Sequence, residues 1–437
     1  MSIAVVILAA GKGTRMVSDI PKALHKVAHA PLLEHTMRAA AILEPEKIVV
    51  IVGYEGEKVA FEAQKINEEA CIAEQKKQLG TAHAVSMAKD ALIGFQGDIL
   101  VLYADTPFIS AETMEKIKDA RAISDLVVLG FKAKDPARYG RLITNGDQLE
   151  RIVEFKDASE EERAITLCNS GVMAGPASLI LSLIEEVDNE NASGEYYLTD
   201  CVALAHAIGK TTKVVICDEK ETLGINTRQD LAIAEAAFQK RARQEHMQNG
   251  VSLLEPETVF FSFDTVIGRD SVVEQHVVFG PETTIERAAY IKAFCYIEGA
   301  HVSVGTIVGP FVRLRPGAEL GEQVRVGNFV EIKNAVIGDG AKINLLSYVG
   351  DAEVGASANI GAGSVTCNFD GVMKHRTKIA EGAFIGSNTM MVAPVNIGKD
   401  AITASGSVIT KDVPEGALAL ARASQETKLG IARKLMD

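Results

Sequence analysis

Residues 8–16, LAAGKGTRM, combine glycine with positive charge directly after an apolar run. Gly11 and Gly13 lack side chains, so backbone N–H groups there can approach a phosphate closely, and Lys12 and Arg15 add positive charge. Two common nucleotide motifs are excluded, because GxGxxG would need glycine where Met16 stands and no GK[ST] follows four spacer residues. Such a glycine turn can be purely structural, but a further cation in SDIPKALHK (18–26) favours a phosphate site.

Asp105 and Asn226 are candidate ligands for a hard metal ion. Asp105, in YADTP, ends a strand-like run, which is where open α/β sheets bind their ligands. Asn226, in LGINTRQD, offers an amide oxygen, and carboxylate and amide oxygens are donors that Mg²⁺ accepts. Either side chain could instead cap a helix. As a pair in a chain with the glycine-rich loop, they favour a Mg²⁺ site.

Alternating strand-like and helix-like segments must position these residues in the first half of the chain. IAVVILA, KIVVIVG, DILVLYAD and DLVVLGF are apolar runs typical of strands buried on both faces, and LLEHTMRAAAIL and GTAHAVSMAKDAL are helix-like. The alternation predicts a Rossmann-like α/β domain with a mixed, mostly parallel sheet over residues 1–226. Residues 227–249 have high helix propensity and precede Gly250, so they predict a linker helix.

Beyond residue 250, a mostly aliphatic residue recurs at intervals of six positions, with a few interruptions. The period runs through Ile267, Val273, Phe279, Ile285, Ile291, Ile297, Val308, Leu314, Leu320, Val326, Ile332, Ile337, Ile343, Val349, Val354, Ile360, Ile379, Ile385, Met391, Ile397, Thr403 and Ile409. Such a period of inward residues is typical of a parallel β-helix, and three hexads per coil give the left-handed form. We expect a left-handed β-helix of hexapeptide repeats over residues 250–437, with residues 366–378 leaving the coil as a loop.

One bulky apolar residue stands out against this period. In KINLLSYVGD (342–351), Ile343 and Val349 lie on the period, but Leu345 lies two residues past it, where side chains point outward. It lies between Asn344 and Tyr348, in a stretch whose other outward residues predict a polar cleft.

Composition excludes several classes of protein. The formal charge of −13 argues against general nucleic-acid binding, and any anionic substrate must be met by local Lys and Arg. The six cysteines show neither CxxC nor a histidine at metal-ligand spacing, which indicates reduced thiols. The N-terminal apolar run lacks a basic region before it, and no segment approaches the length of a membrane span. We expect a cytoplasmic protein.

The motifs together indicate a family. LAAGKGTRM with the Pro21-Lys22 pair resembles the sugar-nucleotidyltransferase signature, and EQKKQLGTAHA, YADTP, RYGRLI, IVEFKDA, CNSGVM and LGINTR extend the match. The chain resembles, nearly end to end, the bifunctional N-acetylglucosamine-1-phosphate uridylyltransferase/glucosamine-1-phosphate acetyltransferase family of bacterial cell-wall synthesis. That resemblance implies the substrates UTP, N-acetylglucosamine-1-phosphate, glucosamine-1-phosphate and acetyl-CoA, a Mg²⁺ cofactor and a homotrimer.

The resemblance also implies roles for residues of the first half. Those expected to contact the nucleotide or its sugar are Leu8, Ala9, Ala10, Gly11, Lys22, Gln75, Gly80, Thr81, Tyr103, Ala104, Asp105, Gly140, Glu154, Asn169 and Asn226. Asp105 and Asn226 hold Mg²⁺, and Arg15 and Lys22 act in uridylyl transfer. In that reaction a sugar-phosphate oxygen attacks the α-phosphorus of UTP in line, so the protein supplies positioning and charge. Losing one such charge is expected to cost about 2.7–4 kcal/mol of transition-state stabilisation.

In the second half the resemblance implies an acetyltransferase site between subunits. Its glucosamine-1-phosphate ligands are Arg315, Lys333, Tyr348, Asn359 and Lys374, and its acetyl-CoA residues are Ala362, Asn368, Phe369, Ser387, Ser405 and Arg422. Two cations facing one phosphate is a sensible arrangement. Single Arg or Lys side chains on a β-helix are usually only solvated, but a matched set at these spacings indicates a site.

Three positions depart from the family pattern. Phe369 and Ser405 stand where tyrosine and alanine are usual, and Leu345 stands where the family has its general-base histidine. Leucine can neither accept nor donate a proton. A positioned base contributes roughly 10²–10⁴-fold to the rate. Substrate binding can therefore persist while acetyl transfer slows.

Four readings follow from this replacement. The chain is bifunctional with slow acetyl transfer or another base, such as water or Asp351; or it is a uridylyltransferase whose β-helix serves trimerisation and binding. A non-catalytic regulatory protein is disfavoured by the presence of Lys22, Asp105 and Asn226. Finally, Leu345 could be an engineered substitution.

Overall fold

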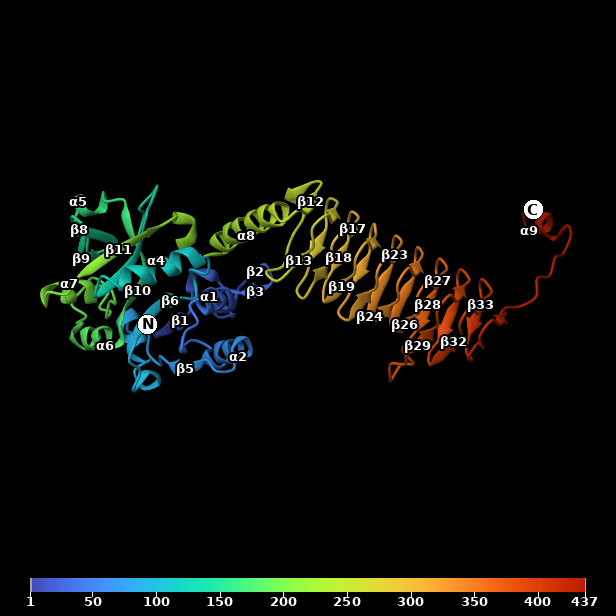
Figure 1. The fold of residues 1–437 in the computed structure, drawn as a ribbon, viewed down its shortest axis with the longest axis horizontal. Coiled ribbons are helices and arrows are strands. Elements are labelled where there is room, and N and C mark those ends of the chain that lie inside the picture. Colours follow the sequence, from blue (N-terminus) through green and yellow to red (C-terminus); the bar gives the residue numbers. More distant parts are fainter. Residues whose placement is uncertain (1, 437) are drawn as a thin grey trace. The chain divides into compact units, whose positions relative to one another are not determined.

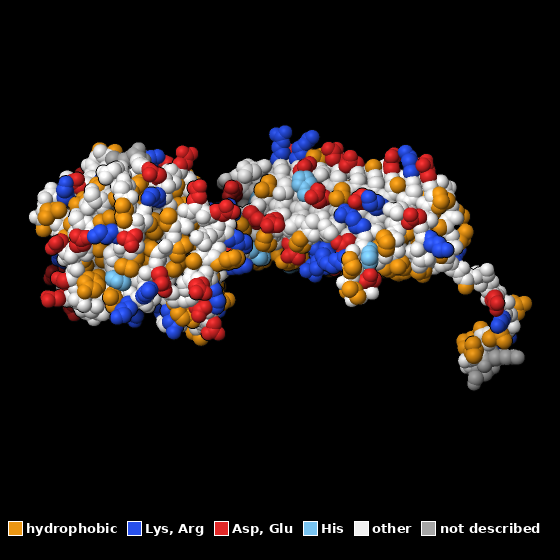
Figure 2. Space-filling model, turned by 90° about the horizontal axis from the view of Figure 1, so that it is seen from below, with side chains coloured by type: hydrophobic (Ala, Val, Ile, Leu, Met, Phe, Trp, Pro, Cys, Tyr) orange, Lys and Arg blue, Asp and Glu red, His pale blue; other side chains and the backbone are white. Residues whose placement is uncertain are grey.

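The computed structural model describes residues 2–436, which form two compact units divided between Ala236 and Ala237 (Figure 1). The first contains an α/β sheet, and the second contains a coil of short parallel strands. No helix within residues 2–436 combines the length and the apolar character that crossing a bilayer requires. Figure 2 shows acidic and basic side chains interspersed over one face of both units.

A mixed sheet forms the centre of the first unit, in the order β11-β7-β10-β6-β1-β4-β5. The strands are β1 (Ile3–Leu8), β4 (Lys47–Val52), β5 (Cys71–Glu74), β6 (Asp98–Tyr103), β7 (Leu126–Lys132), β10 (Leu167–Pro176) and β11 (Thr212–Cys217), with β8 (Arg141–Asn145) and β9 (Gln148–Val153) as a hairpin paired to β10. Only β10 among the main strands runs antiparallel to its neighbours. The predicted mixed, mostly parallel sheet is confirmed.

Helices cover both faces of this sheet. Leu33 of α1 (Leu32–Ala41), Val59 of α2 (Gly56–Ile66) and Ile117 of α4 (Ala111–Arg121) belong to one buried cluster. Val85 of α3 (Thr81–Ser86), Ile180 of α6 (Ala177–Glu186) and Val202 of α7 (Asp200–Ala207) belong to the cluster on the other face. The helix expected over GTAHAVSMAKDAL is shorter than predicted: α3 ends at Ser86, and a 3₁₀ turn follows at Asp90–Leu92.

The parallel pairing of β1 with β6 determines where the site forms. Leu8 pairs with Tyr103 at the carboxyl end of the two strands. Ala9 and Ala104 therefore leave the sheet side by side at one edge, and Ala104 N–H donates to the Leu8 carbonyl (3.1 Å). The glycine-rich loop and Asp105 follow directly from these two points.

The helix α8 (Arg228–Gln248) forms where the sequence predicts a helix over residues 227–249. Its start is fixed by Asp230, whose carboxylate accepts from the backbone N–H groups of Asn226 (2.9 Å) and Thr227 (2.8 Å). In the second unit, His246 near its end stacks on Phe261 at 4.5 Å, and Phe261 stacks on Phe279 at 5.4 Å. This end of α8 thus covers the first coil of that unit.

The second unit is a parallel β-helix with three strand faces. The first face contains β13 (Val266–Ile267), β16 (Thr284–Ile285), β19 (Ala300–Val302), β22 (Ala318–Leu320), β29 (Thr377–Ile379) and β32 (Val395–Ile397). The second contains β12 (Ser252–Leu253), β14 (Val272–Val273), β17 (Tyr290–Ile291), β20 (Ile307–Val308), β23 (Arg325–Val326), β25 (Lys342–Ile343), β27 (Asn359–Ile360), β30 (Phe384–Ile385), β33 (Ile402–Thr403) and β35 (Leu418–Ala419). The third contains β15 (Val278–Phe279), β18 (Tyr296–Ile297), β21 (Arg313–Leu314), β28 (Val365–Cys367), β31 (Met390–Val392) and β34 (Val408–Ile409), while β24 (Glu331–Ile337) and β26 (Tyr348–Val354) continue from the third face into the first. The short helix α9 (Ile431–Met436) follows the coil.

Every residue of the predicted six-residue period is buried, so the left-handed β-helix expected from it is confirmed. Paired strands are separated by one coil: Val266 pairs with Thr284, 18 residues later, and Tyr348 pairs with Val365, 17 residues later. The coil therefore shortens by one residue in places, which explains why the period slips between Ile332 and Ile337. The predicted loop also forms, since Glu353 pairs with Lys378, 25 residues later, while residues 368–376 project from the coil (Figure 1).

Candidate active sites

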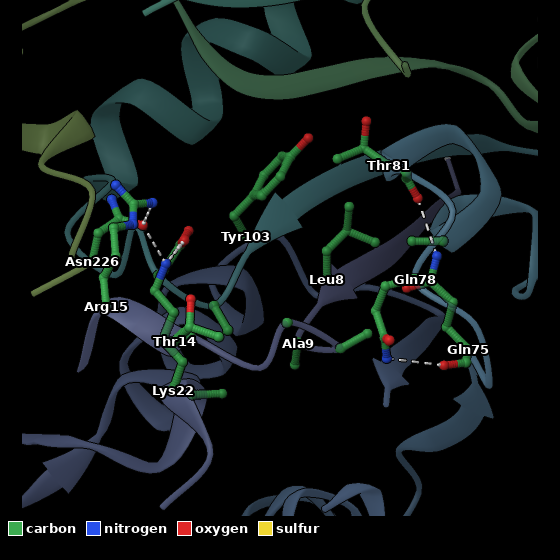
Figure 3. A pocket seen from close by; sticks show the side chains of 18 of the residues that line it. Leu8, Ala9, Thr14, Arg15, Lys22, Gln75, Gln78, Thr81, Tyr103 and Asn226 are labelled. Carbon is green, nitrogen blue, oxygen red and sulfur yellow. Dashed lines mark hydrogen bonds and ion pairs between the residues drawn. The ribbon is translucent and has the colours of Figure 1, made fainter. Parts of the chain in front are cut away.

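A cavity of about 350 Å³ opens at the sheet edge where β1 and β6 end (Figure 3). Its lining includes these residues predicted from the sequence: Leu8, Ala9, Ala10, Gly11, Arg15, Lys22, Gln75, Gly80, Thr81, Tyr103, Ala104, Asp105 and Asn226. They come from segments far apart in the chain, and the fold brings them to one place. The volume suits a small-molecule ligand.

The two glycines of the loop have different structural roles. Apart from its two chain neighbours, no atom of residues 2–436 lies within 4 Å of the position that a Gly11 side chain would take, so the backbone there is open to a ligand. Gly13 is left-handed, with φ of 64°, and a Cβ on it would lie 2.7 Å from Cβ of Lys22. The absence of a side chain at position 13 therefore lets the aliphatic stem of Lys22 cross the loop and bring its ammonium into the cavity.

Two cations and two oxygen donors meet at one end of the cavity. The Lys22 ammonium forms an ion pair with Asp105 and donates to Oδ1 of Asn226 (2.7 Å). Arg15 Nη2 donates to the same amide oxygen (2.9 Å), and Figure 3 shows Arg15, Lys22 and Asn226 converging. The donor set of one carboxylate and one amide oxygen fits a hard divalent cation.

The other end of the cavity is held by amide contacts. Gln75 Nε2 donates to the Gly80 carbonyl (3.1 Å) and contacts Nδ1 of His83 (2.9 Å). Gly80 has φ of 118°, and a Cβ there would overlap the backbone of Tyr196. Thr81 Oγ1 accepts from the Leu198 N–H (2.9 Å). Gln75 is buried, so these contacts fix the orientation of its amide at this end of the cavity.

Gly140, Glu154 and Asn169 do not line this cavity, unlike the other predicted residues. They form a neighbouring group: Asn169 N–H donates to the Gly140 carbonyl (2.9 Å), and a Cβ on Gly140 would lie 3.4 Å from a Glu154 oxygen. Burial raises the pKa of Glu154. Tyr103 lines the cavity, and burial together with the charges of Asp105 and Glu154 raises the pKa of its hydroxyl.

Sequence reasoning missed five lining residues, Thr14, Ala23, Gln78, Ala84 and Glu195. Thr14 lies within LAAGKGTRM and Gln78 within EQKKQLGTAHA, two of the segments that carry the family resemblance. Their position next to residues with predicted roles could have identified them. Lys12, which was expected to add charge near the phosphate, is not among the lining residues, and its ammonium lies 5.1 Å from the centre of the Tyr54 ring.

In the second unit, the predicted glucosamine-1-phosphate residues Arg315, Lys333 and Tyr348 lie on the third face. Leu314 pairs with Ile332, so Arg315 and Lys333, which follow them, occupy the same position on successive coils. Arg315 Nη1 donates to Glu331 (2.8 Å), and this hydrogen bond raises the pKa of Arg315. Its Nε–H is buried and has no partner among the described residues.

A buried carboxylate lies beside these cations. Asp351 accepts from Asn334 Nδ2 (2.5 Å) and from Asn368 Nδ2. Burial alone would raise the pKa of Asp351, but the two amide donors and the charges of Lys374 and Lys333 hold it below its usual range. Contact with Lys374 lowers the pKa of Lys333. A carboxylate stabilised in this way is a weak base, so the structure argues against the expectation that Asp351 could replace a missing base.

The predicted acetyl-CoA residues Ala362, Ser387 and Ser405 lie in one column with Leu345. Ile343, Ile360, Ile385 and Thr403 pair in succession on the second face, and the four column residues each follow one of them by two positions. Arg422 Nη1 donates to the Ser405 carbonyl (2.9 Å) at the end of this column. Leu345 is 42% exposed, as its outward position predicted.

The remaining predicted residues are Asn359, Asn368, Phe369 and Lys374. Asn359 accepts from Asn344 Nδ2 (3.3 Å), on the strand next to Leu345. Asn368 is buried against Asp351, while Phe369 is exposed and forms an antiparallel bridge with Lys374 across the projecting loop. The structure thus brings Asn368 and Lys374 together with Lys333.

An aromatic ladder runs along one corner of the β-helix. His276, Phe294, Phe311 and Phe329 stack on successive coils, with ring centroids 4.9, 4.8 and 5.0 Å apart. The three phenylalanines are 44–53% exposed, and Leu346 continues the line. They border a shallow groove of about 520 Å³ that also includes Tyr348.

Comparison with known proteins gives the family. Residues 5–186 match the MobA-like NTP transferase domain. The chain is 62% identical to the Bifunctional protein GlmU of Ruegeria sp. (strain TM1040) and 57% identical to that of Paracoccus denitrificans (strain Pd 1222), each over 100% of this chain and 97% of the relative. Among solved structures, UDP-glucose pyrophosphorylase complexed with UDP-glucose is similar at 18% identity and a TM-score of 0.43, over 55% of this chain and 100% of that one.

Identity of this extent, over nearly the whole of both chains, confirms the resemblance that the sequence motifs carry. On that basis, the chain belongs to the family of bifunctional GlmU proteins.

Proposed function

We propose that the first unit forms UDP-N-acetylglucosamine from UTP and N-acetylglucosamine-1-phosphate. The observation that carries this proposal is the meeting of Arg15, Lys22, Asp105 and Asn226 at one end of the cavity. A phosphate oxygen of the sugar attacks the α-phosphorus of UTP, and pyrophosphate leaves from the opposite side. No protein nucleophile is required, because alignment and neutralisation of phosphate charge supply the catalysis.

The cavity's own residues suit each part of that reaction. The open backbone at Gly11 lets N–H groups approach the nucleotide phosphates, and Arg15 and Lys22 neutralise charge that builds on the leaving pyrophosphate. Gln75 and Thr81, at the far end, orient the base. We assign the sugar to the group around Glu154 and Asn169; its support is the contact between Asn169 and Gly140.

Mg²⁺ would be held by Asp105 and Asn226. When bound, it would neutralise phosphate charge and orient the reacting groups. Lys22 contacts both oxygens in the structure, so its ammonium is also close enough to neutralise charge on the neighbouring phosphates. The remaining ligands would come from the phosphates themselves and from water.

The second unit is proposed to transfer the acetyl group of acetyl-CoA to glucosamine-1-phosphate. Its support is the cationic group of Arg315, Lys333 and Lys374 for the phosphate, together with the column that includes Ala362 and Ser387 for the coenzyme. Leu345 supplies no base, so the substrate amine must lose its proton to water. Acetyl transfer is accordingly proposed to be slow.

We assign uridylyl transfer to residues 1–226, the linker to 227–249 and acetyl transfer to 250–437. We propose a homotrimer, as the family resemblance implies. The exposed ladder Phe294–Phe311–Phe329 supports self-association, because stacked apolar side chains on a rigid corner favour burial against another copy of the chain. UTP and acetyl-CoA are intracellular metabolites, so we propose the cytoplasm as the compartment. The cysteines, all free within residues 2–436, are compatible with it.

Two assays on the purified chain test the proposal. Pyrophosphate release from UTP and N-acetylglucosamine-1-phosphate with Mg²⁺ is expected to be robust, and its absence would contradict the first assignment. Coenzyme A release from acetyl-CoA and glucosamine-1-phosphate is expected to be weak but measurable. No release at all would favour the second candidate, a uridylyltransferase whose β-helix serves assembly and binding, which the apolar Leu345 specifically supports.

A further inference from the structure

The third face of the β-helix carries two outward rows of side chains around the cationic group. The first row is Arg313, Glu331 and Tyr348, which pair in succession on β21, β24 and β26. The second row, two residues further along each strand, is Arg315, Lys333 and Gly350, since Lys333 pairs with Gly350. Residues two apart on a strand point to the same side, so both rows face the same solvent region.

The second row lacks a side chain at its third position, where Gly350 follows the two cations. That space is filled from the first row. A Cβ built on Gly350 would lie 2.5 Å from Cζ and 2.7 Å from Cε1 of Tyr348, and closer still to its hydroxyl. The phenol of Tyr348 therefore lies across Gly350 and brings its hydroxyl into line with Arg315 and Lys333.

The backbone at Gly350 is fixed and cannot easily move away from a new side chain. Its N–H donates to Oγ1 of the buried Thr366 (2.8 Å), and the same hydroxyl donates to the Gly350 carbonyl (2.9 Å). A methyl group at position 350 must therefore displace the tyrosine ring rather than the strand. The ring is the end of a flexible side chain, so it can swing outward while the coil stays intact.

We propose that Gly350 is a positioning residue for glucosamine-1-phosphate. It has no side chain, so the Tyr348 hydroxyl lies beside Arg315 and Lys333 and completes a row of phosphate donors one strand spacing, about 4.8 Å, apart. The inference rests on the proposed acetyl-transfer function and refines how its sugar phosphate is held.

The test is binding of glucosamine-1-phosphate to the full chain by isothermal titration calorimetry. Gly350→Ala and Tyr348→Phe are each expected to weaken binding roughly 10- to 100-fold, the contribution of a hydrogen bond to a charged group. The double variant is expected to bind about as weakly as either single one, because both changes remove the same contact. Val336→Ala, on an exposed outward position of β24, serves as the control and is expected to bind normally.

The outcomes separate this inference from the function on which it rests. If the unaltered chain does not bind glucosamine-1-phosphate, the proposed second site is wrong, and the inference with it. If the unaltered chain binds and Gly350→Ala binds equally well, or if the two changes are additive, the inference alone is wrong.

If Gly350→Ala folds poorly, a second substitution shows whether the added methyl group clashes with the tyrosine ring or with the backbone. If the clash is with the tyrosine ring, adding Tyr348→Ala restores the melting temperature to that of Tyr348→Ala alone. Failure to restore it would place the clash in the backbone and overturn the inference.

Discussion

At the scale of single residues, Lys22 is at once a catalytic candidate and a competitor for the metal ligands. Its ammonium contacts both Asp105 and Asn226, the two oxygens proposed for Mg²⁺. A metal ion and this ammonium cannot occupy the same position, so Lys22 would have to turn toward the phosphates if Mg²⁺ is held there as proposed. Binding of metal and nucleotide is therefore expected to be coupled.

Replacing Lys22 with methionine tests this competition. We expect Lys22→Met to bind Mn²⁺ more tightly in the absence of nucleotide, as measured by loss of the free-ion electron paramagnetic resonance signal. Uridylyl transfer is expected to fall by about 10²–10³-fold, because a transition-state charge is lost. Lys12→Met is the control, since Lys12 lies over Tyr54, and unchanged Mn²⁺ affinity in Lys22→Met would contradict the competition.

Leu345 permits the opposite kind of test, a gain of function. Leu345→His is expected to raise acetyl transfer by roughly 10²–10⁴-fold, measured as coenzyme A release, because an exposed base then stands at the head of the proposed acetyl-CoA column. The gain is expected to decline below about pH 6.5, where histidine becomes protonated. Leu345→Asn introduces polarity without a base and is expected to give no such gain. Equal rates in both variants would show that position 345 does not carry the base.

At the scale of elements, the end of α8 makes the stability of the second unit sensitive to acid. His246 stacks on Phe261, and burial lowers the pKa of its imidazole. The folded state therefore favours the neutral ring. This contribution is fully present above the unfolded pKa of about 6.5 and is lost as the pH falls below it.

His246→Phe keeps an aromatic ring in the stack but removes the proton. Between pH 7 and pH 5, we expect the melting temperature of the second unit's transition to fall further in the unaltered chain than in this variant. His206→Phe, which changes an exposed histidine of α7 in the first unit, is the control and is expected to leave that pH dependence unchanged. Identical pH dependence in His246→Phe would show that the stack does not respond to His246 protonation.

The elements could be predicted to the extent that local patterns determine them. Each residue from Ile267 to Ile409 that the hexapeptide period predicts to point inward is buried. The prediction succeeds because inward and outward positions repeat locally in a short coil. β10 was not identified, since its LCNSG start is small and polar and it pairs through neighbours distant in sequence. The split of GTAHAVSMAKDAL into α3 and a 3₁₀ turn depends likewise on tertiary packing.

The site was predicted residue by residue, but not its contacts. Motifs placed Lys22, Asp105 and Asn226 in one cavity without showing that Lys22 bridges the other two. Gly13 was expected to expose backbone, whereas it makes room for the Lys22 stem. The overlap of Tyr348 with Gly350 depends on side-chain direction within a coil, which the period alone does not specify.

At the scale of the whole molecule, self-association is expected to separate the two activities. Phe311→Glu would place a charge within the ladder between Phe294 and Phe329. We expect a smaller species in sedimentation velocity, loss of acetyl transfer, and uridylyl transfer within about twofold of the unaltered chain, because the first cavity lies within one unit. Phe384→Glu, at an exposed phenylalanine outside the ladder, is the control. Unchanged sedimentation of Phe311→Glu would contradict the proposed role of the ladder.

The aromatic ladder also allows assembly to be followed by fluorescence. The chain contains no tryptophan, so its intrinsic emission comes from tyrosine and phenylalanine only. An indole placed at Phe311 would be the sole such fluorophore, sandwiched between Phe294 and Phe329 on a rigid corner. The wavelength of its emission maximum would then report whether that corner faces water or another surface. Following that wavelength during dilution would measure dissociation of the assembly.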